Sequence, residues 1–281
     1  FLFEKSSNTL KKFSRKYTIL NELCKIFYDK ELSIATYKSQ NMSNFSYKWK
    51  NFEISRAQAI QAIGARAKIT PEMNPILLKP LGNYVSSVYL NGKRFKKMHA
   101  KDYYSKFVKS VGIKTAMSSL KTLEKKYDLI IIEGAGSPAE INLQKFDIAN
   151  MTIAEKTKSP VVIITDIDRG GSFASLVGTL SLLEKKHQKL IKGFVFNKFL
   201  GDVEILKPGF TKLKRLTKKE VFGVIPKIKI NIPDEDSLDS KPKTFLWNKR
   251  NLSVIDMEID KLSKLVQKNI NIKALEKIIG W

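Results

Sequence analysis

Four short runs of apolar, mostly β-branched residues recur in the second half of the chain, and the first three end in polar residues. The runs cover 129–132, 161–164, 191–196 and 221–226. Segments of helical length separate them, notably 171–186 and 208–217. Strands that are apolar on both faces and alternate with helices are typical of a parallel sheet covered on both sides. The pattern therefore predicts an α/β fold with a mostly parallel sheet and helices on both faces.

The residues that follow these runs have the character of a ligand site. Glu133 directly follows the first run and precedes two glycines, Gly134 and Gly136. In open α/β sheets, ligands collect at the carboxyl ends of strands, where glycines let the backbone approach closely. Glu133 is therefore a candidate Mg²⁺ ligand beside a nucleotide. The alternative is that the glycines only turn the chain and that Glu133 is solvated.

Composition indicates how many domains the chain can form and in which cell compartment we expect it. The 281 residues, 43% of them apolar, suffice for one principal core of about 200–240 residues with appendages. A single cysteine excludes an internal disulfide framework. No apolar run approaches the roughly 18 residues of a membrane span, and the opening Phe-Leu-Phe is too short for a signal peptide. We expect a cytoplasmic protein with no membrane partner.

The formal net charge of +24 raises nucleic-acid binding as a function class. Only seven of the 51 basic residues are arginines, however, and lysines occur in nearly every expected helix and loop. Specific nucleic-acid readers rely on the bidentate contacts of arginine and concentrate their charge. We therefore expect nonspecific attraction of polyanions and no specific nucleic-acid partner.

Seven motifs carry a family resemblance. They are SQNMS (39–43), EISRAQ (53–58), MNPILLKP (73–80), EGAGSPAEINL (133–143), DIANM (147–151), DIDRGGSFASL (166–176) and NKFLGD (197–202). In this order they resemble cobyric acid synthase, the glutamine-dependent amide ligase of cobalamin biosynthesis. The resemblance runs from about residue 30 to Leu238.

The resemblance implies a fold and a reaction. The family's first half is a dethiobiotin-synthetase-like, P-loop-related ATPase domain, and its second half is a glutaminase with a catalytic triad. Mg·ATP activates substrate carboxylates as acyl phosphates, and ammonia from the glutaminase then displaces phosphate to leave an amide. The implied substrate is the corrinoid adenosylcobyrinic a,c-diamide. Related ATPase domains pair across an interface near the nucleotide, which implies a homodimer.

The sequence departs from the family at two places. No glycine precedes Gly64, although a phosphate loop depends on glycine conformations; Lys16 and Thr18 are the expected remnants of that loop. No glutaminase half is recognisable, since the single cysteine, Cys24, is expected to be a helix core residue and the two histidines surface residues. We expect residues 1–238 to form the ATPase domain, with 1–20 as a degenerate phosphate-loop region. Residues 239–254 are then a lysine-rich linker and 255–281 a helical tail, with ammonia arriving free or from a separate glutaminase chain.

Candidate roles follow for individual residues. The resemblance assigns Lys38 to the reacting phosphate, where a cation would stabilise charge on the transferred phosphoryl group; the alternative is a surface lysine. Glu133 and Glu53 are the candidate Mg²⁺ ligands, although Glu53 is also expected to open a helix running to about Ala67, as a first-turn acid. Asn197 is the candidate reader of adenine, and its alternative is a turn residue. The candidate substrate-binding residues are Asn41, Arg56, Gln58, Asn74, Lys79, Asp166, Asp168 and Arg169.

Three functions of different classes remain open at this stage. The chain is an ATP-dependent corrinoid amide ligase, a noncatalytic relic or scaffold of that fold, or a lysine-rich polyanion-binding protein. The first predicts binding of Mg·ATP, the second predicts none, and the third predicts affinity for nucleic acid that falls steeply with salt.

Overall fold

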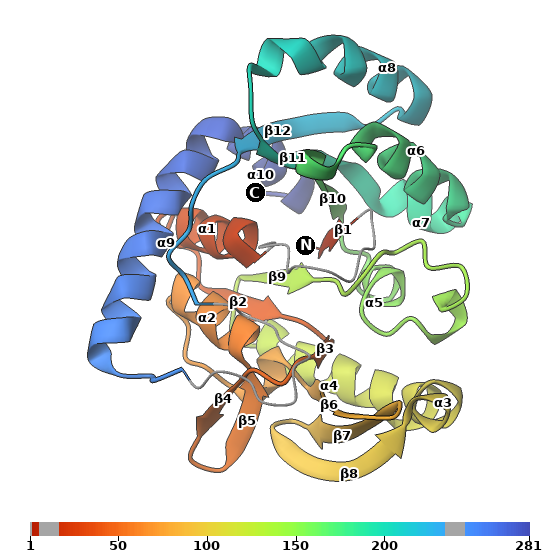
Figure 1. Cartoon of the computed structure of the whole chain (residues 1–281), viewed down its shortest axis with the longest axis vertical. Coiled ribbons are helices and arrows are strands. Elements are labelled where there is room, and N and C mark those ends of the chain that lie inside the picture. The colour runs from red at the N-terminus through yellow and green to blue at the C-terminus, as the bar shows by residue number, and fades with distance from the viewer. Residues whose placement is uncertain (1, 6–16, 234–244) are drawn as a thin grey trace. The chain divides into compact units, whose positions relative to one another are not determined.

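The computed structural model describes residues 2–5, 17–233 and 245–281 (Figure 1). These residues divide into two compact units. The first unit is built from the described parts of Phe1–Ser14, Gly134–Ile230 and Lys264–Trp281, and the second from those of Arg15–Glu133 and Asn231–Ser263. Each unit is formed by segments that are distant in sequence.

A parallel sheet forms the centre of the first unit, in the order β12-β11-β10-β1. Its strands are β1 (Leu2–Lys5), β10 (Val161–Asp166), β11 (Ile191–Phe199) and β12 (Glu220–Pro226), and all neighbours pair in parallel. All six residues of β10 are buried. Because successive side chains of a strand point to opposite faces, this burial means that both faces of β10 are covered. The α/β fold with a parallel sheet is therefore confirmed.

The first unit also contains helices, which lie before, between and after strands β10, β11 and β12 in the chain. They are α5 (Met151–Thr157), α6 (Ser172–Leu182), α7 (Lys185–Leu190), α8 (Lys207–Thr217) and α10 (Ile272–Ile279), with short 3₁₀ turns η3 (Gln144–Phe146), η4 (Ile167–Arg169) and η5 (Val203–Leu206). The single helix expected over 171–186 is wrong. The helix ends at Leu182 because Leu183 adopts extended backbone angles and buries its side chain, and a separate polar helix then begins at Lys185.

A glycine on β12 allows the C-terminal segment to approach the strand closely. Gly223 forms an antiparallel bridge with Ile270, and the amide of Asn271 donates to the carbonyl of Phe222 at 2.7 Å. A Cβ atom at position 223 would lie 2.1 Å from the carbonyl oxygen of Asn269. The close approach therefore requires a residue without a side chain.

The second unit contains a parallel pair, β2 (Ile34–Tyr37) and β9 (Leu129–Glu133), in which Tyr37 lies opposite Ile132. Helices α1 (Tyr17–Tyr28) and α2 (Arg56–Gly64) pack against each other and against β2, and α4 (Ile113–Glu124) contacts β9. The side chain of Cys24 is fully buried in α1, as expected of a helix core residue.

A second sheet in this unit has the order β3-β6-β7-β8, and it comprises β3 (Gln40–Met42), β6 (Ile76–Gly82), β7 (Val85–Leu90) and β8 (Lys93–His99). The β7–β8 turn uses Asn91 and Gly92, both with positive φ, as a two-residue hairpin turn of type I′ requires. After β8, the short helix α3 (Ala100–Asp102) leads into η2 (Tyr103–Gly112), a ten-residue π-helix.

The helix expected to open at Glu53 is wrong. Glu53 lies in β5 (Phe52–Ser55), which pairs with β4 (Ser46–Trp49) as an antiparallel hairpin, and α2 begins only at Arg56. Ser55 caps α2 by accepting from the amide of Gln58. Its own amide donates to Asn74 Oδ1 at 3.1 Å, which holds the preceding residues in the extended conformation of a strand.

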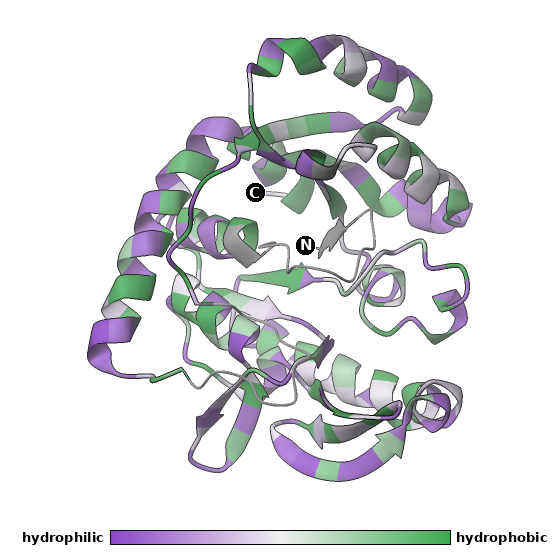
Figure 2. Cartoon of the chain, in the orientation of Figure 1, coloured by the Kyte–Doolittle hydropathy of each residue, from purple (hydrophilic) through white to green (hydrophobic). Residues whose placement is uncertain are grey.

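The tail contains α9 (Lys249–Asn269), which begins inside the expected linker and carries both hydrophobic and hydrophilic bands (Figure 2). Ile255 and Ile259 bury against Ile60 of α2 within the second unit. Arg66 forms ion pairs with Asp256 and Asp260. Across the described residues, the structure has no helix that is both long and apolar enough to cross a membrane.

Candidate functional site

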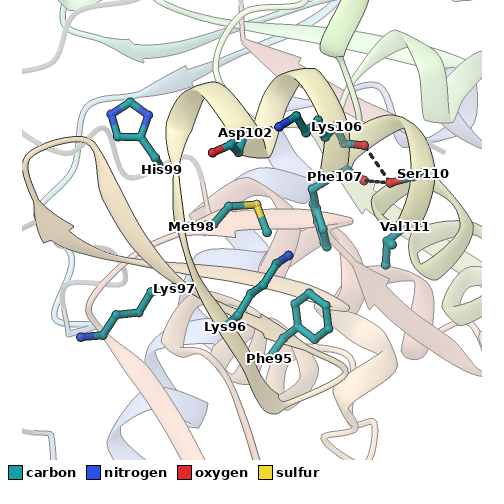
Figure 3. A pocket seen from close by; sticks show the side chains of 10 residues that line it. All are labelled: Phe95, Lys96, Lys97, Met98, His99, Asp102, Lys106, Phe107, Ser110 and Val111. Carbon is teal, nitrogen blue, oxygen red and sulfur yellow. Dashed lines mark hydrogen bonds and ion pairs between the residues drawn. The ribbon is translucent and has the colours of Figure 1, made fainter.

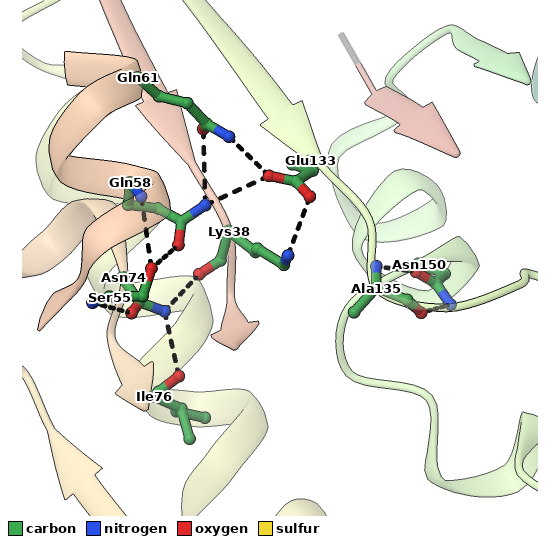
Figure 4. Close-up of polar contacts among 9 residues, drawn as sticks. All are labelled: Lys38, Ser55, Gln58, Gln61, Asn74, Ile76, Glu133, Ala135 and Asn150. Carbon is green, nitrogen blue, oxygen red and sulfur yellow. Dashed lines mark hydrogen bonds and ion pairs between the residues drawn. The ribbon is translucent and has the colours of Figure 1, made fainter. Parts of the chain in front are cut away.

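A buried ion pair lies at the carboxyl ends of β2 and β9. Lys38 directly follows β2, and Glu133 is the last residue of β9; parallel pairing brings the two positions to the same end. The Nζ of Lys38 lies 2.9 Å from Oε1 of Glu133, and the two side chains are 4% and 2% exposed (Figure 4). At this burial, the attraction of the two charges is screened far less than at a surface.

Two glutamines of α2 complete the contacts of the Glu133 carboxylate. Gln58 and Gln61 donate from Nε2 to its other oxygen, Oε2, at 3.2 and 2.6 Å. Residues three apart on a helix lie on the same face, so both amides reach one carboxylate (Figure 4). The hydroxyl of Ser55 binds Oε1 of Gln58, which fixes the orientation of that amide. Glu133 is thereby held in one position.

Asn74 forms hydrogen bonds with the backbone next to this cluster. Its Nδ2 donates to the carbonyls of Lys38 and Ile76, both at 3.1 Å, and its Oδ1 accepts from the amide of Ser55. The side chain is 1% exposed. Asn74 therefore links three backbone segments around Lys38, and its expected contact with substrate stays a prediction.

A second cluster joins two other expected site residues. Glu53 binds the ammonium of Lys79 and the hydroxyl of Ser46, and Lys79 Nζ also lies 5.6 Å from the ring centroid of Tyr89. Burial, and then the nearby Glu53 carboxylate, raise the pKa of Tyr89. Glu53 is thus neutralised by a lysine, in contacts separate from those of Glu133.

Arg56 and Asn41 are buried elsewhere in the same unit. The Arg56 guanidinium lies 3.9 Å from the ring centroid of Phe45 and 5.5 Å from that of Phe245, a cation–π arrangement. Asn41 is in β3 and is 4% exposed. Both residues are polar groups inside the unit, and their expected contact with a corrinoid stays a prediction.

The first unit places its own candidates at the carboxyl ends of β10 and β11. Asp166 lies opposite Asn197 in the strand register, and Asp166 accepts from Lys198 Nζ at 2.9 Å. Lys198 has a positive φ of 63°, and its amide donates to Asn197 Oδ1 at 2.9 Å.

The residues just after Asp166 were also expected to bind substrate. Asp168 pairs with Lys227 at 2.8 Å. Arg169 ends η4, and its side chain lies outside what the structure describes.

The glycine-containing segment after Glu133 is held by Asn150. Its side-chain amide exchanges two hydrogen bonds with the backbone of Ala135, at 2.7 and 2.9 Å (Figure 4). Asp147 accepts from the amides of Ala149, Asn150 and Thr152, which caps the start of α5. The segment is therefore anchored to α5 at its first residues.

Two expected phosphate-loop residues receive little structural description. Lys16 lies outside the described residues, and Thr18 falls in α1 without a described side chain. Conversely, Gln61, Lys198 and Asn150 contact the candidate sites but were not assigned roles from sequence. The signal for Gln61 was its spacing of three from Gln58, and the other two stand inside recognised motifs without a role of their own.

The cluster around Glu133 fits a Mg²⁺ ion on chemical grounds. Mg²⁺ takes one or two carboxylates and fills its remaining positions with water and phosphate oxygens, so the lack of three-residue metal clusters in the described chain does not exclude it. Both carboxylate oxygens of Glu133 already accept hydrogen bonds. Glu133 would be the carboxylate that holds such an ion, beside the ammonium of Lys38.

Comparisons with known proteins agree with the motifs. The family described as "AAA domain" matches residues 81–233. The chain is 47% identical over 230 residues to a probable cobyric acid synthase of Thermococcus kodakarensis, covering 81% of this chain and 47% of that protein. It is 41% identical over 271 residues to a cobyric acid synthase of Clostridium novyi, covering 94% and 53%. The resemblance expected from the seven motifs is confirmed.

The extent of these matches is also informative. The chain spans about half the length of the curated relatives it matches. Among solved structures, MinD of Aquifex aeolicus aligns over 100% of this chain and 96% of its own, at 11% identity and a TM-score of 0.47.

Proposed function

Because the chain belongs to the AAA domain family, we propose that it binds Mg·ATP and amidates side-chain carboxylates of a corrinoid, converting adenosylcobyrinic a,c-diamide to cobyric acid. One observation carries the proposal: a lysine and a carboxylate form a buried pair at the carboxyl ends of two parallel strands. This is the edge at which α/β sheets bind ligands. The names of the relatives supply the substrate class.

The proposed chemistry has two balanced steps. A substrate carboxylate attacks the γ-phosphorus of ATP, which forms an acyl phosphate and releases ADP. Ammonia then attacks the acyl carbon, phosphate leaves, and loss of a proton gives the amide. We expect the ammonia to be free or to come from a separate glutaminase chain.

Lys38 and Glu133 have different proposed roles at the reacting phosphate. The ammonium of Lys38 stabilises the negative charge that develops on the transferred phosphoryl group. Gln58 and Gln61 keep the Glu133 carboxylate in place, so that it positions Lys38 and can hold a cation. Bound Mg²⁺ would supply further positive charge to the phosphate oxygens.

The other candidates keep their proposed roles, each within its own unit. Asn197 would read the adenine edge, and Glu53 would assist at the metal. The remaining polar candidates, Asn41, Arg56, Asn74, Lys79, Asp166, Asp168 and Arg169, would face the substrate. A homodimer would follow from the pairing seen in related ATPase domains.

The first test is calorimetric titration of the folded chain with Mg·ATP, with inorganic triphosphate as the control for simple attraction to lysines. We expect saturable binding that favours Mg·ATP, and at least a tenfold loss of affinity in Lys38→Met, on the order of 1.4 kcal/mol. The matched variant Lys121→Met removes an exposed charge from α4 and should bind as the parent does. Equal binding of both ligands would contradict the proposal.

The second test is amidation of adenosylcobyrinic a,c-diamide with ammonium chloride and Mg·ATP, followed by mass spectrometry. Each amide replaces a hydroxyl by an amino group and so lowers the product mass by about one unit. Nucleotide binding without amidation would restrict the function to ATP binding.

A noncatalytic role is the second candidate, and one observation favours it. Both carboxylate oxygens of Glu133 already accept hydrogen bonds from side chains of the chain itself, as in a purely structural contact. Corrinoid binding by equilibrium dialysis, in a chain that fails to bind Mg·ATP, would support this candidate over the ligase.

A further inference from the structure

A hollow of about 360 Å³ opens in the second unit between β8 and the π-helix η2 (Figure 3). None of the residues assigned to the proposed reaction lines it. Its volume falls in the range of small-molecule sites, about 300–1,000 Å³. It is therefore a candidate binding site that is distinct from the proposed amidation centre.

The interior of this pocket is apolar. Phe107 and Met98 are 4% and 7% exposed and form its buried part, whereas Phe95 and Val111 are exposed at its edge. The rings of Phe95 and Phe107 lie with centroids 6.1 Å apart, on either side of the hollow (Figure 3). A flat apolar group laid against Phe107 and the edge of Phe95 would bury aromatic surface that water now contacts.

The lining also carries an excess of positive charge. Three lysines contribute to it, Lys96, Lys97 and Lys106, against one carboxylate, Asp102. Lys106 pairs with Asp102 at 3.0 Å, and this lysine lowers the pKa of Asp102. In the described chain, neither Lys96 nor Lys97 forms an ion pair with a carboxylate, and Lys96 Nζ lies 5.3 Å from the Phe95 ring centroid. The ammonium of Lys96, which points into the hollow (Figure 3), can therefore pair with an anionic group of a ligand.

The wall formed by η2 is conformationally unusual. Ten residues, Tyr103–Gly112, form a π-helix, and the amide of Ile113 still donates to the carbonyl of Val108, five residues back. Such helices are rare, usually last a single turn and occur frequently at functional sites. This one contributes Lys106, Phe107 and Val111 to the pocket, so the irregular backbone and the charged, aromatic lining coincide.

We propose that this pocket binds a small amphipathic anion, an aromatic or alicyclic ring that carries a single carboxylate. The ring packs on Phe107 and Met98 beside Phe95, and the carboxylate is held by Lys96, the lysine of β8 that points into the hollow (Figure 3). A polyanion such as nucleic acid would use the lysines but not the buried Phe107 and Met98. The site goes beyond the proposed function, because it needs neither ATP nor the residues around Glu133.

The test is a titration of the ¹⁵N-labelled full chain with 2-naphthoate, followed by amide chemical shifts. We expect saturable shifts confined to residues 95–99 and 106–111. Two control probes separate the contributions: 2-naphthalenemethanol keeps the ring without the charge, and inorganic phosphate keeps a charge without the ring. Each should bind at least about tenfold more weakly, which corresponds to roughly 1.4 kcal/mol.

Charge-matched variants decide whether the lysines of the pocket act specifically. Lys96→Gln changes an exposed residue of β8 and should weaken 2-naphthoate about fivefold, whereas Lys121→Gln on α4 should leave its affinity unchanged. Phe107→Leu, if folded, should weaken it as well. No saturable binding, equal losses in Lys96→Gln and Lys121→Gln, or full displacement by a short oligonucleotide would each overturn the inference.

Discussion

At the scale of single residues, the pairing of Lys38 with Glu133 makes a strong prediction for stability. Glu133→Gln leaves the buried ammonium of Lys38 without its carboxylate, and we expect a loss of about 3–5 kcal/mol in the free energy of unfolding. Lys38→Met should be less harmful, because two amides still donate to Glu133. The double variant should be more stable than Glu133→Gln alone. Urea unfolding of all four proteins measures these values, and strictly additive losses would contradict the interpretation.

A second residue-scale prediction concerns Glu22 in α1. Its side chain is fully buried, and neither carboxyl oxygen accepts from another described residue. Burial, and then the nearby Glu258, raise the pKa of Glu22 well above its ordinary value of 4.5. The folded state therefore keeps this proton at pH values where the unfolded state has lost it. Protonated Glu22 therefore contributes fully to the free energy of unfolding below about pH 4.5. This contribution is lost as the pH rises through the pKa of Glu22 in the folded state.

We expect Glu22→Gln to flatten this part of the pH dependence and to be more stable than the parent at pH 8. Thermal unfolding of both proteins between pH 4.5 and 8 measures the difference. Parallel curves for the two proteins would show that Glu22 ionises normally in the folded state.

Residue roles could be predicted from sequence where one strand end determines them. Glu133 was found because it follows an apolar run, and a parallel sheet gathers such positions at one edge, whereas the role proposed for Lys38 came from the family resemblance. The partnership of Gln61 with Glu133 was missed, since it depends on how α2 packs beside β9. Glu53 was expected in a helix, and only the Asn74 contact with Ser55 shows why the strand continues past it.

At the scale of elements, the contact between β12 and the C-terminal segment depends on Gly223. Gly223→Ala places a Cβ against the backbone of Asn269, and we expect a loss of about 1–3 kcal/mol, as for other overpacked sites. Gly178→Ala is the matched control: it lies within α6, with nothing within 4 Å of the added Cβ. It should stabilise by about 0.5–1 kcal/mol. Chemical denaturation of both variants gives the comparison, and equal effects would refute the assigned close approach.

Elements were predictable where the hydrophobic pattern was continuous and long. Strands β9, β10, β11 and β12 follow apolar runs and were expected nearly within their bounds, whereas β1 lies in a segment that was expected to be a degenerate phosphate-loop region. The sheet with β6, β7 and β8 was not, because its strands are half-exposed and rich in lysine and serine. The π-helix η2 could not be expected either, since its hydrogen bonds span five residues while its sequence resembles that of an ordinary amphipathic helix.

At the scale of the whole molecule, the net charge of +24 predicts a strong dependence on salt. Like charges repel more in the compact state than in the expanded one. We therefore expect the melting temperature to rise between about 20 and 300 mM sodium chloride, where the screening length falls from tens of ångströms toward a few. Binding to a random oligonucleotide should disappear over the same range. Retention of that binding at high salt would indicate a specific nucleic-acid site.

The fold class could be predicted from the apolar runs, and the family resemblance from the order of the motifs between about residue 30 and Leu238. The division into two units could not, because each unit collects segments that are distant in sequence. Composition indicates how large a core the chain can form, but it does not say which segments share one. Ile255 and Ile259 of the tail pack against Ile60, so this part of the tail belongs to the second unit.

The buried thiol of Cys24 is a natural probe of how often the structure around α1 opens. It is the single cysteine in the sequence, its side chain is inaccessible in α1, and burial raises the pKa of its thiol. Alkylating reagents act on the thiolate, so modification has to wait until α1 separates from its neighbours. The rate of labelling by iodoacetamide in native buffer therefore measures how often this helix is exposed, with no engineered probe and no other sulfhydryl in the chain to confuse the signal.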